Sequence, residues 1–340
     1  MTATPTPAYG NKIDAYVDRN IVMELVRVTE AAAMAASEYI GTGDKHGADQ
    51  VATDAMRRAL NCLDIDGTIV IGEGERDEAP MLYIGEKVGL GGVGIDIAVD
   101  PLEGTDVTAR GGENAIAVIA AGAKGSFLHA PDVYMDKLAL GPGYDINKFS
   151  LDMPPEEIVR EVARQKGVPA NRLVVCVLDR SRHEDLVAAV RRSGARIKFI
   201  GDGDVAGALA TAMPGSGIDL LLGSGGSPEG VLAAAALRCV GGHILGRLLI
   251  RNEAERARAE KWGITDFSKI YRTEELAGGE VMFAATGVTN GTLLQGVTEV
   301  PGGQTSHSLV MRSKTGTIRK IETFHTDSKL ATAGRAQPAA

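Results

Sequence analysis

The chain has 340 residues, of which 44% are hydrophobic and 24% charged, a composition typical of a globular protein with a large core. With 36 basic and 44 acidic residues its formal net charge is -8, which argues against nucleic acid or an anionic membrane as the main partner. No apolar run approaches the roughly 20 residues that span a bilayer, and no signal peptide is visible. We therefore expect a cytoplasmic protein, and the three separated cysteines suit that reducing compartment.

The first half of the chain predicts two helices followed by strands. Apolar residues at helical spacing predict a helix over RNIVMELVRVTEAAAMAASEYI (19–40). After a break at GTGDKHGADQ, the segment VATDAMRRALNCL (51–63) continues as a second helix. The apolar stretches TIVIG (68–72), GIDIAVD (94–100) and NAIAVIAAGA (114–123) are typical of buried strands.

The second half alternates helices and strands. We expect helices at PEEIVREVARQKG (155–167), DLVAAVRRSG (185–194), VAGALATAM (205–213) and PEGVLAAAALRCV (228–240). The strand candidates are RLVVCVLD (172–179), ARIKFIGD (195–202) and IDLLLGS (218–224). This alternation predicts an α/β fold with helices on both faces of a mixed or parallel sheet. We expect two lobes, at 19–150 and 151–327, with flexible tails at 1–18 and 328–340.

The segment VDPLEGTDVT carries two carboxylates directly behind an apparent strand. We expect Asp100 to end that strand and the following proline to open a helical turn, so that Asp100 and Glu103 face one point. Gly104 lets a ligand approach the backbone, and Thr105 adds a hydroxyl near helix N–H groups that favour an anion. These oxygen ligands suit Mg²⁺ or Mn²⁺. A capped acidic turn exposed to solvent explains the motif equally well.

Two other polar loops offer carboxylates that could join this motif. GEGERDE places Glu73, Glu75 and Asp77 straight after an apolar strand, although most acidic loops are only solvated. GDKHGAD contributes Lys45 and Asp49 at a helix break, which on its own is as consistent with a helix stop and a new N-cap. If the strands are neighbours, their carboxyl ends bring these side chains beside DPLEGT.

Two glycine-rich loops resemble phosphate-binding loops. GDGDVA has the shape of the dinucleotide-binding fingerprint, so an NAD-binding oxidoreductase is an alternative. However, Asp202 and Asp204 aim negative charge where a pyrophosphate needs neutral N–H groups, and they are better suited to sugar hydroxyls. GSGGSPEG lacks the third glycine of that fingerprint but can cradle an anion or a metal, with Glu229 opening the next helix.

Two further segments carry basic or aromatic side chains, and the first of them, LDRSRH, lies just beyond a strand. Arg180 and Arg182, in LDRSRH, present forked guanidinium groups suited to phosphate, and a basic surface loop is the equally plausible alternative. Tyr134, in APDVYMDK, is by itself best explained as a core aromatic whose hydroxyl reaches outward.

Taken in order, these loops resemble those of class II fructose-1,6-bisphosphatase, the bacterial GlpX type of the lithium-sensitive phosphatase superfamily. The resemblance rests on GDKHGADQ, TIVIGEGERDEAPMLYIGE, DIAVDPLEGT, APDVYMDKL, DRSRH, DGDV and GGSPEG, and it extends from about Arg19 to His325. The DPxxGT element indicates only the superfamily, whereas GEGERDEAPMLYIGE is specific to the class.

The resemblance implies a layered α/β/α/β/α sandwich, a homodimer or homotetramer, and a sugar bisphosphate as substrate. It makes the first lobe metal-binding and catalytic and the second lobe sugar-phosphate-binding. Asp49 and Glu73 would hold one Mg²⁺ or Mn²⁺ ion, and Asp100, Glu103 and Glu229 a second. The implied substrate contacts are Glu103, Gly104, Thr105, Gly226, Tyr134, Arg180, Ser181, Arg182, Asp202, Gly203 and Asp204. Relatives often have proline at the position of Ser181.

The resulting hypothesis is metal-assisted hydrolysis of the C1 phosphate of fructose 1,6-bisphosphate. Thr105 would orient the attacking water, Glu75 or Asp77 would take its proton, and Lys45 would stabilise charge on the phosphoryl oxygens. Some cyanobacterial relatives also hydrolyse sedoheptulose 1,7-bisphosphate, so a dual enzyme is one alternative. An inositol or nucleotide phosphatase and a non-catalytic sugar-phosphate-binding regulator are others.

Overall fold

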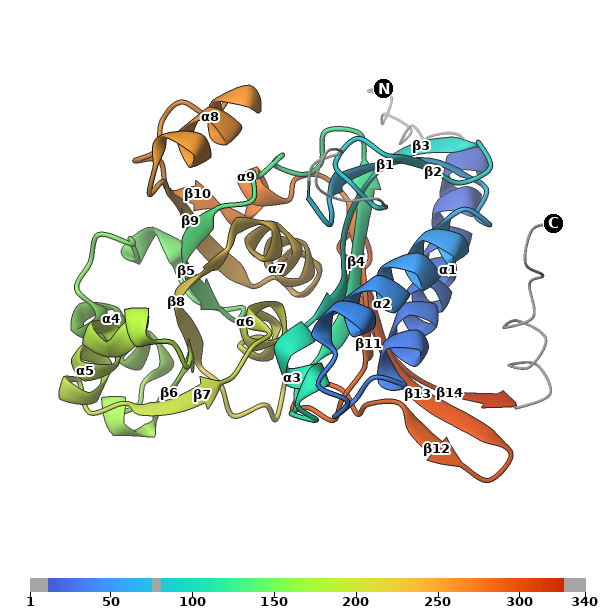
Figure 1. Ribbon diagram of the computed structural model, residues 1–340. Helices are drawn as coiled ribbons and strands as arrows, with labels where there is room; N and C mark the ends of the chain where they lie inside the picture. Colours follow the sequence, from blue (N-terminus) through green and yellow to red (C-terminus); the bar gives the residue numbers. More distant parts are fainter. Residues whose placement is uncertain (1–11, 75–80, 327–340) are drawn as a thin grey trace, which may run out of the picture.

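A computed structural model of the protein describes residues 12–74 and 81–326 (Figure 1). Within these residues the first sheet has eight strands, in the order β12-β13-β11-β4-β3-β1-β2 with β14 paired to β13. They are β1 (Ile65–Ile71), β2 (Lys87–Val88), β3 (Val93–Glu103), β4 (Ile116–Ala123), β11 (Val281–Gly287), β12 (Thr298–Val300), β13 (Gly303–Arg312) and β14 (Thr317–Thr326).

The second sheet has the order β10-β9-β5-β8-β6-β7 among the described residues. Its strands are β5 (Tyr134–Leu140), β6 (Val174–Leu178), β7 (Arg196–Ile200), β8 (Leu220–Gly226), β9 (His243–Leu249) and β10 (Tyr271–Arg272). The β6–β7 and β6–β8 pairs are parallel, whereas β5 runs antiparallel to both β8 and β9. Both sheets are therefore mixed, since β1 and β3 are parallel within the otherwise antiparallel first sheet.

Helices cover both sheets and fill the space between them. The α-helices are α1 (Lys12–Ser37), α2 (Lys45–Leu60), α3 (Thr105–Ala109), α4 (Pro155–Lys166), α5 (Glu184–Arg192), α6 (Asp204–Ala210), α7 (Ser227–Val240), α8 (Glu253–Lys261) and α9 (Thr273–Leu276). Short 3₁₀ helices are η1 (Ile146–Lys148), η2 (Ala170–Arg172) and η3 (Ser181–His183). None of the helices in the described ranges is long and apolar enough to cross a membrane.

Three apolar cores define five layers. One core joins α1 and α2 to the outer face of the first sheet, a second joins both inner sheet faces to α6 and α7, and a third joins α4 and α5 to the second sheet. The layers are thus α1–α2, first sheet, α6–α7, second sheet and α4–α5 (Figure 1). The α/β/α/β/α sandwich predicted from the sequence is confirmed.

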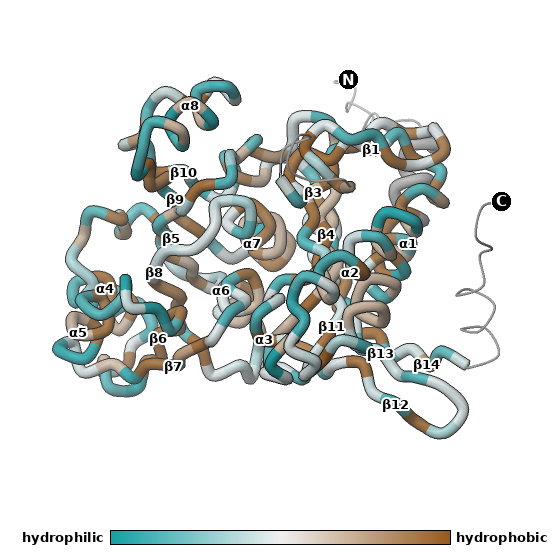
Figure 2. Tube along the Cα trace, viewed as in Figure 1, coloured by the Kyte–Doolittle hydropathy of each residue, from teal (hydrophilic) through white to brown (hydrophobic). Residues whose placement is uncertain are grey.

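The central helix α7 shows how the sequence specifies a layer. Its segment VLAAAALRCV is apolar on nearly all sides, as expected of a helix enclosed between two sheets. In Figure 2, α7 carries mostly brown and pale residues, whereas α8 at the rim is largely teal. The many alanines let both sheets approach this helix closely, and the first turn of α7 then lies where strand ends of both sheets meet.

The predicted helical turn at Pro101 is wrong. Strand β3 continues to Glu103, and α3 begins only at Thr105 after Gly104 at φ 101°. In the register with β4, Asp100 pairs with Val118 and Glu103 with Ile116, so β3 holds one extra residue. Residues three apart on a regular strand point to opposite faces, and this bulge returns both carboxylates to the same face.

The division of the chain between the two sheets does not fall at residue 150. Strand β5 precedes that residue and belongs to the second sheet, while β11 to β14 return to the first sheet. The lobe limits at 19–150 and 151–327 stay a prediction. Helix α1 begins at Lys12, inside the predicted tail 1–18. Residues 1–11 and the whole predicted tail 328–340 lie outside the described residues.

Candidate active site

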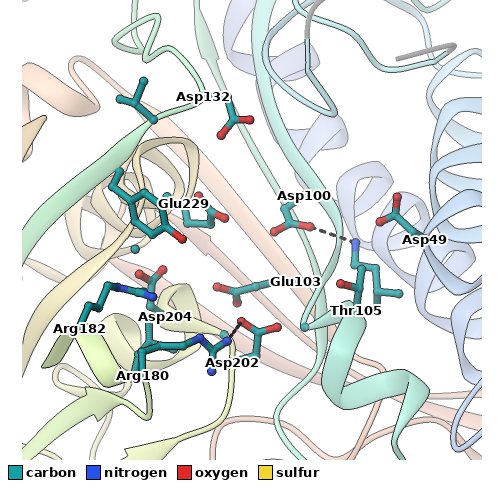
Figure 3. A pocket seen from close by; sticks show the side chains of 18 of the residues that line it. Asp49, Asp100, Glu103, Thr105, Asp132, Arg180, Arg182, Asp202, Asp204 and Glu229 are labelled. Atoms are coloured by element: carbon teal, nitrogen blue, oxygen red, sulfur yellow. Dashed lines mark hydrogen bonds and ion pairs between the residues drawn. The ribbon is translucent and has the colours of Figure 1, made fainter. Parts of the chain in front are cut away.

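A pocket of about 530 Å³ opens between the first and second sheets (Figure 3). Strand β3 and the start of α3 supply one wall, and the ends of β6, β7 and β8 with the start of β5 supply the other. Most of the side chains predicted for the site line it: Asp49, Asp100, Glu103, Gly104, Thr105, Tyr134, Arg180, Arg182, Asp202, Gly203, Asp204, Gly226 and Glu229. Segments far apart in the sequence, from Asp49 to Arg258, therefore meet at one place.

Glu73 lies beside this pocket. It lines an adjoining cavity of about 210 Å³ together with Asp100, Asp132 and Glu229, all three of which also line the main pocket. The two cavities thus share a carboxylate wall. Of the remaining candidates in the same loop, Glu75 and Asp77 lie outside the described residues.

Besides Glu73, two predicted residues within the described ranges do not line the main pocket. Lys45 is the first residue of α2, and its Nζ lies 3.5 Å from Asp106 Oδ1, which places it beside the start of α3. Ser181 is exposed in η3, between two arginines that do line the pocket. Lys45 is therefore near Thr105, because it pairs with Asp106, the next residue of α3. Ser181 forms part of the η3 turn that carries the two arginines.

Glu103 connects the two walls of the pocket. Its carboxylate accepts hydrogen bonds from the backbone N–H groups of Val205 (2.6 Å) and Ala206 (3.4 Å) in the first turn of α6. Gly203, at φ 83°, brings the GDGDVA loop close enough for this contact. Because a carboxylate already occupies these N–H groups, they are not available to a pyrophosphate, which weighs against dinucleotide binding.

Burial and mutual repulsion raise the pKa values of three carboxylates at one end of the pocket, Glu73, Asp100 and Glu103. Burial, then the charges of Asp49 and Glu229, raise the pKa of Glu73 to about 8. Burial, followed by Glu73, Glu103 and other carboxylates, raises the pKa of Asp100 well above its ordinary value. Burial and then Asp204 do the same for the pKa of Glu103, although the Val205 N–H group counteracts them. Such mutual repulsion indicates a place designed for an added cation.

The donor chemistry of this end fits a divalent cation. Asp49, Glu73, Asp100, Glu103 and Glu229 offer only carboxylate oxygens there, and Glu229 Oε2 is buried without a hydrogen-bond partner among the described residues. An unpaired buried oxygen is costly unless something binds it, and Mg²⁺ and Mn²⁺ prefer such oxygens. No three Asp, Glu, His or Cys side chains within 12–74 and 81–326 already stand at the spacing of a complete metal site.

Arginines line the opposite end of the pocket. Arg180 donates to the Gly201 carbonyl at 2.6 Å and lies 3.4 Å from Asp202 Oδ1. Arg182 donates from Nη2 to the Ser224 carbonyl at 2.7 Å and from Nε to Ser224 Oγ at 3.1 Å. These bonds hold both guanidinium groups at the pocket, so one cavity has an acidic end and a basic end (Figure 3).

His183, next to these arginines in sequence, has a structural role. It is buried, its Nδ1 lies 2.8 Å from the Leu178 carbonyl, and its Nε2 accepts the Ser224 N–H at 2.9 Å. Both ring nitrogens are therefore used inside the protein, and Nε2 must be unprotonated to accept that bond.

Sequence reasoning missed four polar residues. Asp132 lines both cavities, and Arg251 and Arg258 line the main pocket. Lys137, 1% exposed, lies below the pocket and donates from Nζ to Asp204 Oδ2 at 2.7 Å. Asp132 and Lys137 flank Tyr134 in the APDVYMDK motif, which could have suggested them, whereas nothing local in the polar segment of α8 marks Arg251 or Arg258.

Comparison with known proteins places the chain in a family. Residues 19–325 match the model of bacterial fructose-1,6-bisphosphatase, glpX-encoded. The chain is 45% identical over 335 residues to the D-fructose 1,6-bisphosphatase class 2/sedoheptulose 1,7-bisphosphatase of Synechococcus sp. strain JA-3-3Ab, covering 91% of this chain and 96% of that protein.

It is also 47% identical over 322 residues to fructose-1,6-bisphosphatase 1 class 2 of Escherichia coli K12, covering 90% of this chain and 95% of that protein. The solved structure of an extragenic suppressor from Pyrococcus furiosus overlaps 58% of this chain and 70% of that one at 13% identity, with a TM-score of 0.29, too low to support any conclusion. The chain belongs to the family of bacterial, glpX-encoded fructose-1,6-bisphosphatases, which are phosphoric monoester hydrolases of sugar metabolism.

Proposed function

We propose that this pocket hydrolyses the C1 phosphate of fructose 1,6-bisphosphate to give fructose 6-phosphate and phosphate. The observation that carries the proposal is the division of one cavity into a carboxylate end and an arginine end. A substrate with two phosphates has the matching asymmetry: cations bound by the carboxylates attract one phosphate, and guanidinium groups bind the other.

Divalent cations complete the carboxylate end in this proposal. Asp49 and Glu73 would hold one ion, and Asp100, Glu103 and Glu229 a second. When bound, Mg²⁺ or Mn²⁺ neutralises phosphate charge and lowers the pKa of a bound water. The unpaired Glu229 Oε2 and the raised pKa of Glu73 support this assignment, because both features disappear when a cation binds.

The residues around Thr105 would act on the reacting phosphate and its water. Gly104, in the left-handed region at φ 101°, turns the chain so that the Thr105 hydroxyl lines the pocket near Asp100 and Glu103. There the hydroxyl can orient a water for attack on phosphorus, in line with the bond that breaks between phosphorus and the C1 oxygen. Glu103, Gly104 and Gly226 can contact the same phosphate. Glu75 or Asp77 would receive the proton. Lys45, 3.5 Å from Asp106, would offset developing negative charge.

The sugar and the distal phosphate would lie toward the second sheet. Asp202 and Gly203 face the pocket and can accept hydrogen bonds from sugar hydroxyls. Asp204 lines the same wall and one of its oxygens, Oδ2, already accepts from Lys137. Only its other oxygen would be available to a sugar hydroxyl. Tyr134 and the Arg180-Ser181-Arg182 segment would bind the distal phosphate.

A second candidate activity is hydrolysis of sedoheptulose 1,7-bisphosphate. It is favoured by the 45% identity to the Synechococcus protein whose name carries both activities. The inositol or nucleotide phosphatase alternative finds no comparable support, since an inositol monophosphate leaves the arginine end without a partner. We further propose a cytoplasmic homodimer or homotetramer.

The test is phosphate release from a panel of esters with Mg²⁺, Mn²⁺ or added Li⁺. The panel contains fructose 1,6-bisphosphate, sedoheptulose 1,7-bisphosphate, inositol 1-phosphate and adenosine monophosphate. We expect metal-dependent release from the first, and from the second if the enzyme is dual. Cleavage of only the last two, or full activity after removal of divalent cations, would refute the proposal.

A further inference from the structure

Two guanidinium groups, not one, lie against the ring of Tyr134. The Cζ atom of Arg182 is 4.9 Å from the ring centroid and that of Arg251 is 4.4 Å from it. All three side chains line the main pocket, and they come from η3, from the segment between β9 and α8, and from the start of β5. A guanidinium at this distance is attracted to the ring, so the Tyr134 side chain is a common contact for both arginines.

Arg251 is also held from behind by Glu255 in α8. The Glu255 side chain is 2% exposed, and its Oε1 accepts hydrogen bonds from Arg251 Nε at 2.9 Å and Nη2 at 2.5 Å. Its Oε2 accepts the backbone N–H of Arg251 at 2.7 Å, and Asn252 caps the helix by accepting the N–H of Glu255. A buried carboxylate with this many bonds fixes the guanidinium plane.

One edge of that guanidinium remains available. Arg251 Nη1 forms no hydrogen bond with any residue of the described parts of the chain, and the Arg251 side chain is 57% exposed. Asp132 also lines the pocket and is a further, weaker charge that acts on Arg251. The free edge of the guanidinium is suited to an anionic ligand, because its N–H groups donate charge-assisted hydrogen bonds.

We propose that Arg251 is a further substrate-binding residue, which joins Arg182 and Tyr134 in holding the distal phosphate, and that Glu255 is its positioning residue. The inference rests on the proposed function and deepens it, because it identifies what lets the enzyme distinguish a bisphosphate from a monophosphate. A dianionic phosphate bound by two guanidinium groups gains two charge-assisted contacts that a substrate without that phosphate cannot make.

The first test measures binding of fructose 6-phosphate, which carries only the distal phosphate, by calorimetry without turnover. We expect Arg251→Gln to raise its Kd about tenfold or more. Arg256→Gln is the matched control: this arginine lies nearby in α8, 3.5 Å from Glu253 and 4.9 Å from the Phe267 ring, and does not line the pocket. An Arg251→Gln Kd within twofold of wild type overturns the inference, and so does wild type that does not bind fructose 6-phosphate.

The second test compares fructose 1,6-bisphosphate with fructose 1-phosphate as substrates. We expect Glu255→Gln and Arg251→Gln to raise KM for the bisphosphate while leaving its kcat, and both constants for fructose 1-phosphate, unchanged. Equal losses on both substrates would mean a general structural role and overturn the inference.

The two tests also separate the inference from the proposed function. If fructose 6-phosphate binds in an Arg251-dependent way while the bisphosphate is not cleaved, the proposed function fails and the role of Arg251 in binding the phosphate stands. If the bisphosphate is cleaved by wild type and by Arg251→Gln with the same KM, the inference fails and the proposed function stands.

Discussion

Lys137 Nζ lies 2.7 Å from Asp204 Oδ2 in an ion pair beneath the pocket, and the two side chains are 1% and 6% exposed. Lys137 also acts on Glu229, lowering a pKa that burial raises. Lys137 thus supplies a fixed positive charge to Asp204 and Glu229, independently of any bound cation. The pair therefore offsets part of the carboxylate charge at the wall of the site.

Removing one member of this pair should strongly destabilise the fold. Lys137→Met leaves Asp204 buried without its partner, and we expect the free energy of unfolding to fall by about 3–5 kcal/mol. Denaturant unfolding measures it. The double variant Lys137→Met/Asp204→Asn should recover a large part of that loss, because the unpaired charge is gone; additive losses from the two changes would contradict the pairing.

The metal-free protein should become more stable as pH falls from 9 toward 5. Glu73 has a pKa of about 8 in the folded protein against an ordinary value of 4.5, so the folded state binds the proton more tightly. A group raised in this way destabilises the fold increasingly from about pH 4.5 to pH 8, and by a constant amount above that.

Glu73→Gln removes this contribution. In the presence of a chelator, its Tm should exceed that of wild type at pH 9 and approach it near pH 5. Saturating Mg²⁺ should cancel the advantage at pH 9, because the cation neutralises the ionised carboxylate. A Glu73→Gln Tm equal to that of wild type across the range would argue against a strained carboxylate here.

Thr105→Ala should lower kcat for fructose 1,6-bisphosphate by roughly 10²–10³-fold, the usual cost of losing one polar group at the reacting atoms. The residue is half-buried at the start of α3 and its side-chain hydroxyl anchors no described residue, so Tm should hardly change. Thr105→Ser keeps the hydroxyl and should retain most of the activity. Normal turnover by the alanine variant would remove Thr105 from the mechanism.

Asp100→Asn should weaken activation by Mg²⁺. Partners that only orient a metal ligand are worth about 10–100-fold in metal affinity, so loss of a ligand itself should cost at least as much. The measurement is the Mg²⁺ concentration that gives half-maximal phosphate release. Asp66→Asn is the control, since Asp66 is paired with Lys87 and Lys124 on the surface of the same sheet. An unchanged Mg²⁺ requirement would exclude Asp100 as a ligand.

Most secondary structure could be predicted because periodicity is local. The apolar segment 228–240 predicts the buried helix α7, and the strands at 94–100, 172–179 and 218–224 match β3, β6 and β8 within a few residues. One exception was α2, which begins at Lys45 inside the predicted break at 41–50. Another was Pro101, where local chemistry favours a helix start. Pairing of β3 with β4 outweighs that preference: β4 pairs with Asp100 and, beyond the bulge, with Glu103, which extends the strand to Glu103.

The sequence by itself determined which chemistry is present: carboxylates, arginines and glycines in loops that follow strands, in an order that belongs to one phosphatase family. Only the tertiary structure decided how they combine. The bulge at Asp100 turns two carboxylates to one side, and Glu103 joins the sheets through α6. Lys137 pairs with Asp204 beneath the pocket, and Arg251 reaches the pocket from a segment without a local signal. The reason is physical: a side chain's residue type sets its affinity for a metal or phosphate, but contacts between distant segments set its neighbours, and the neighbours fix its charge and its direction.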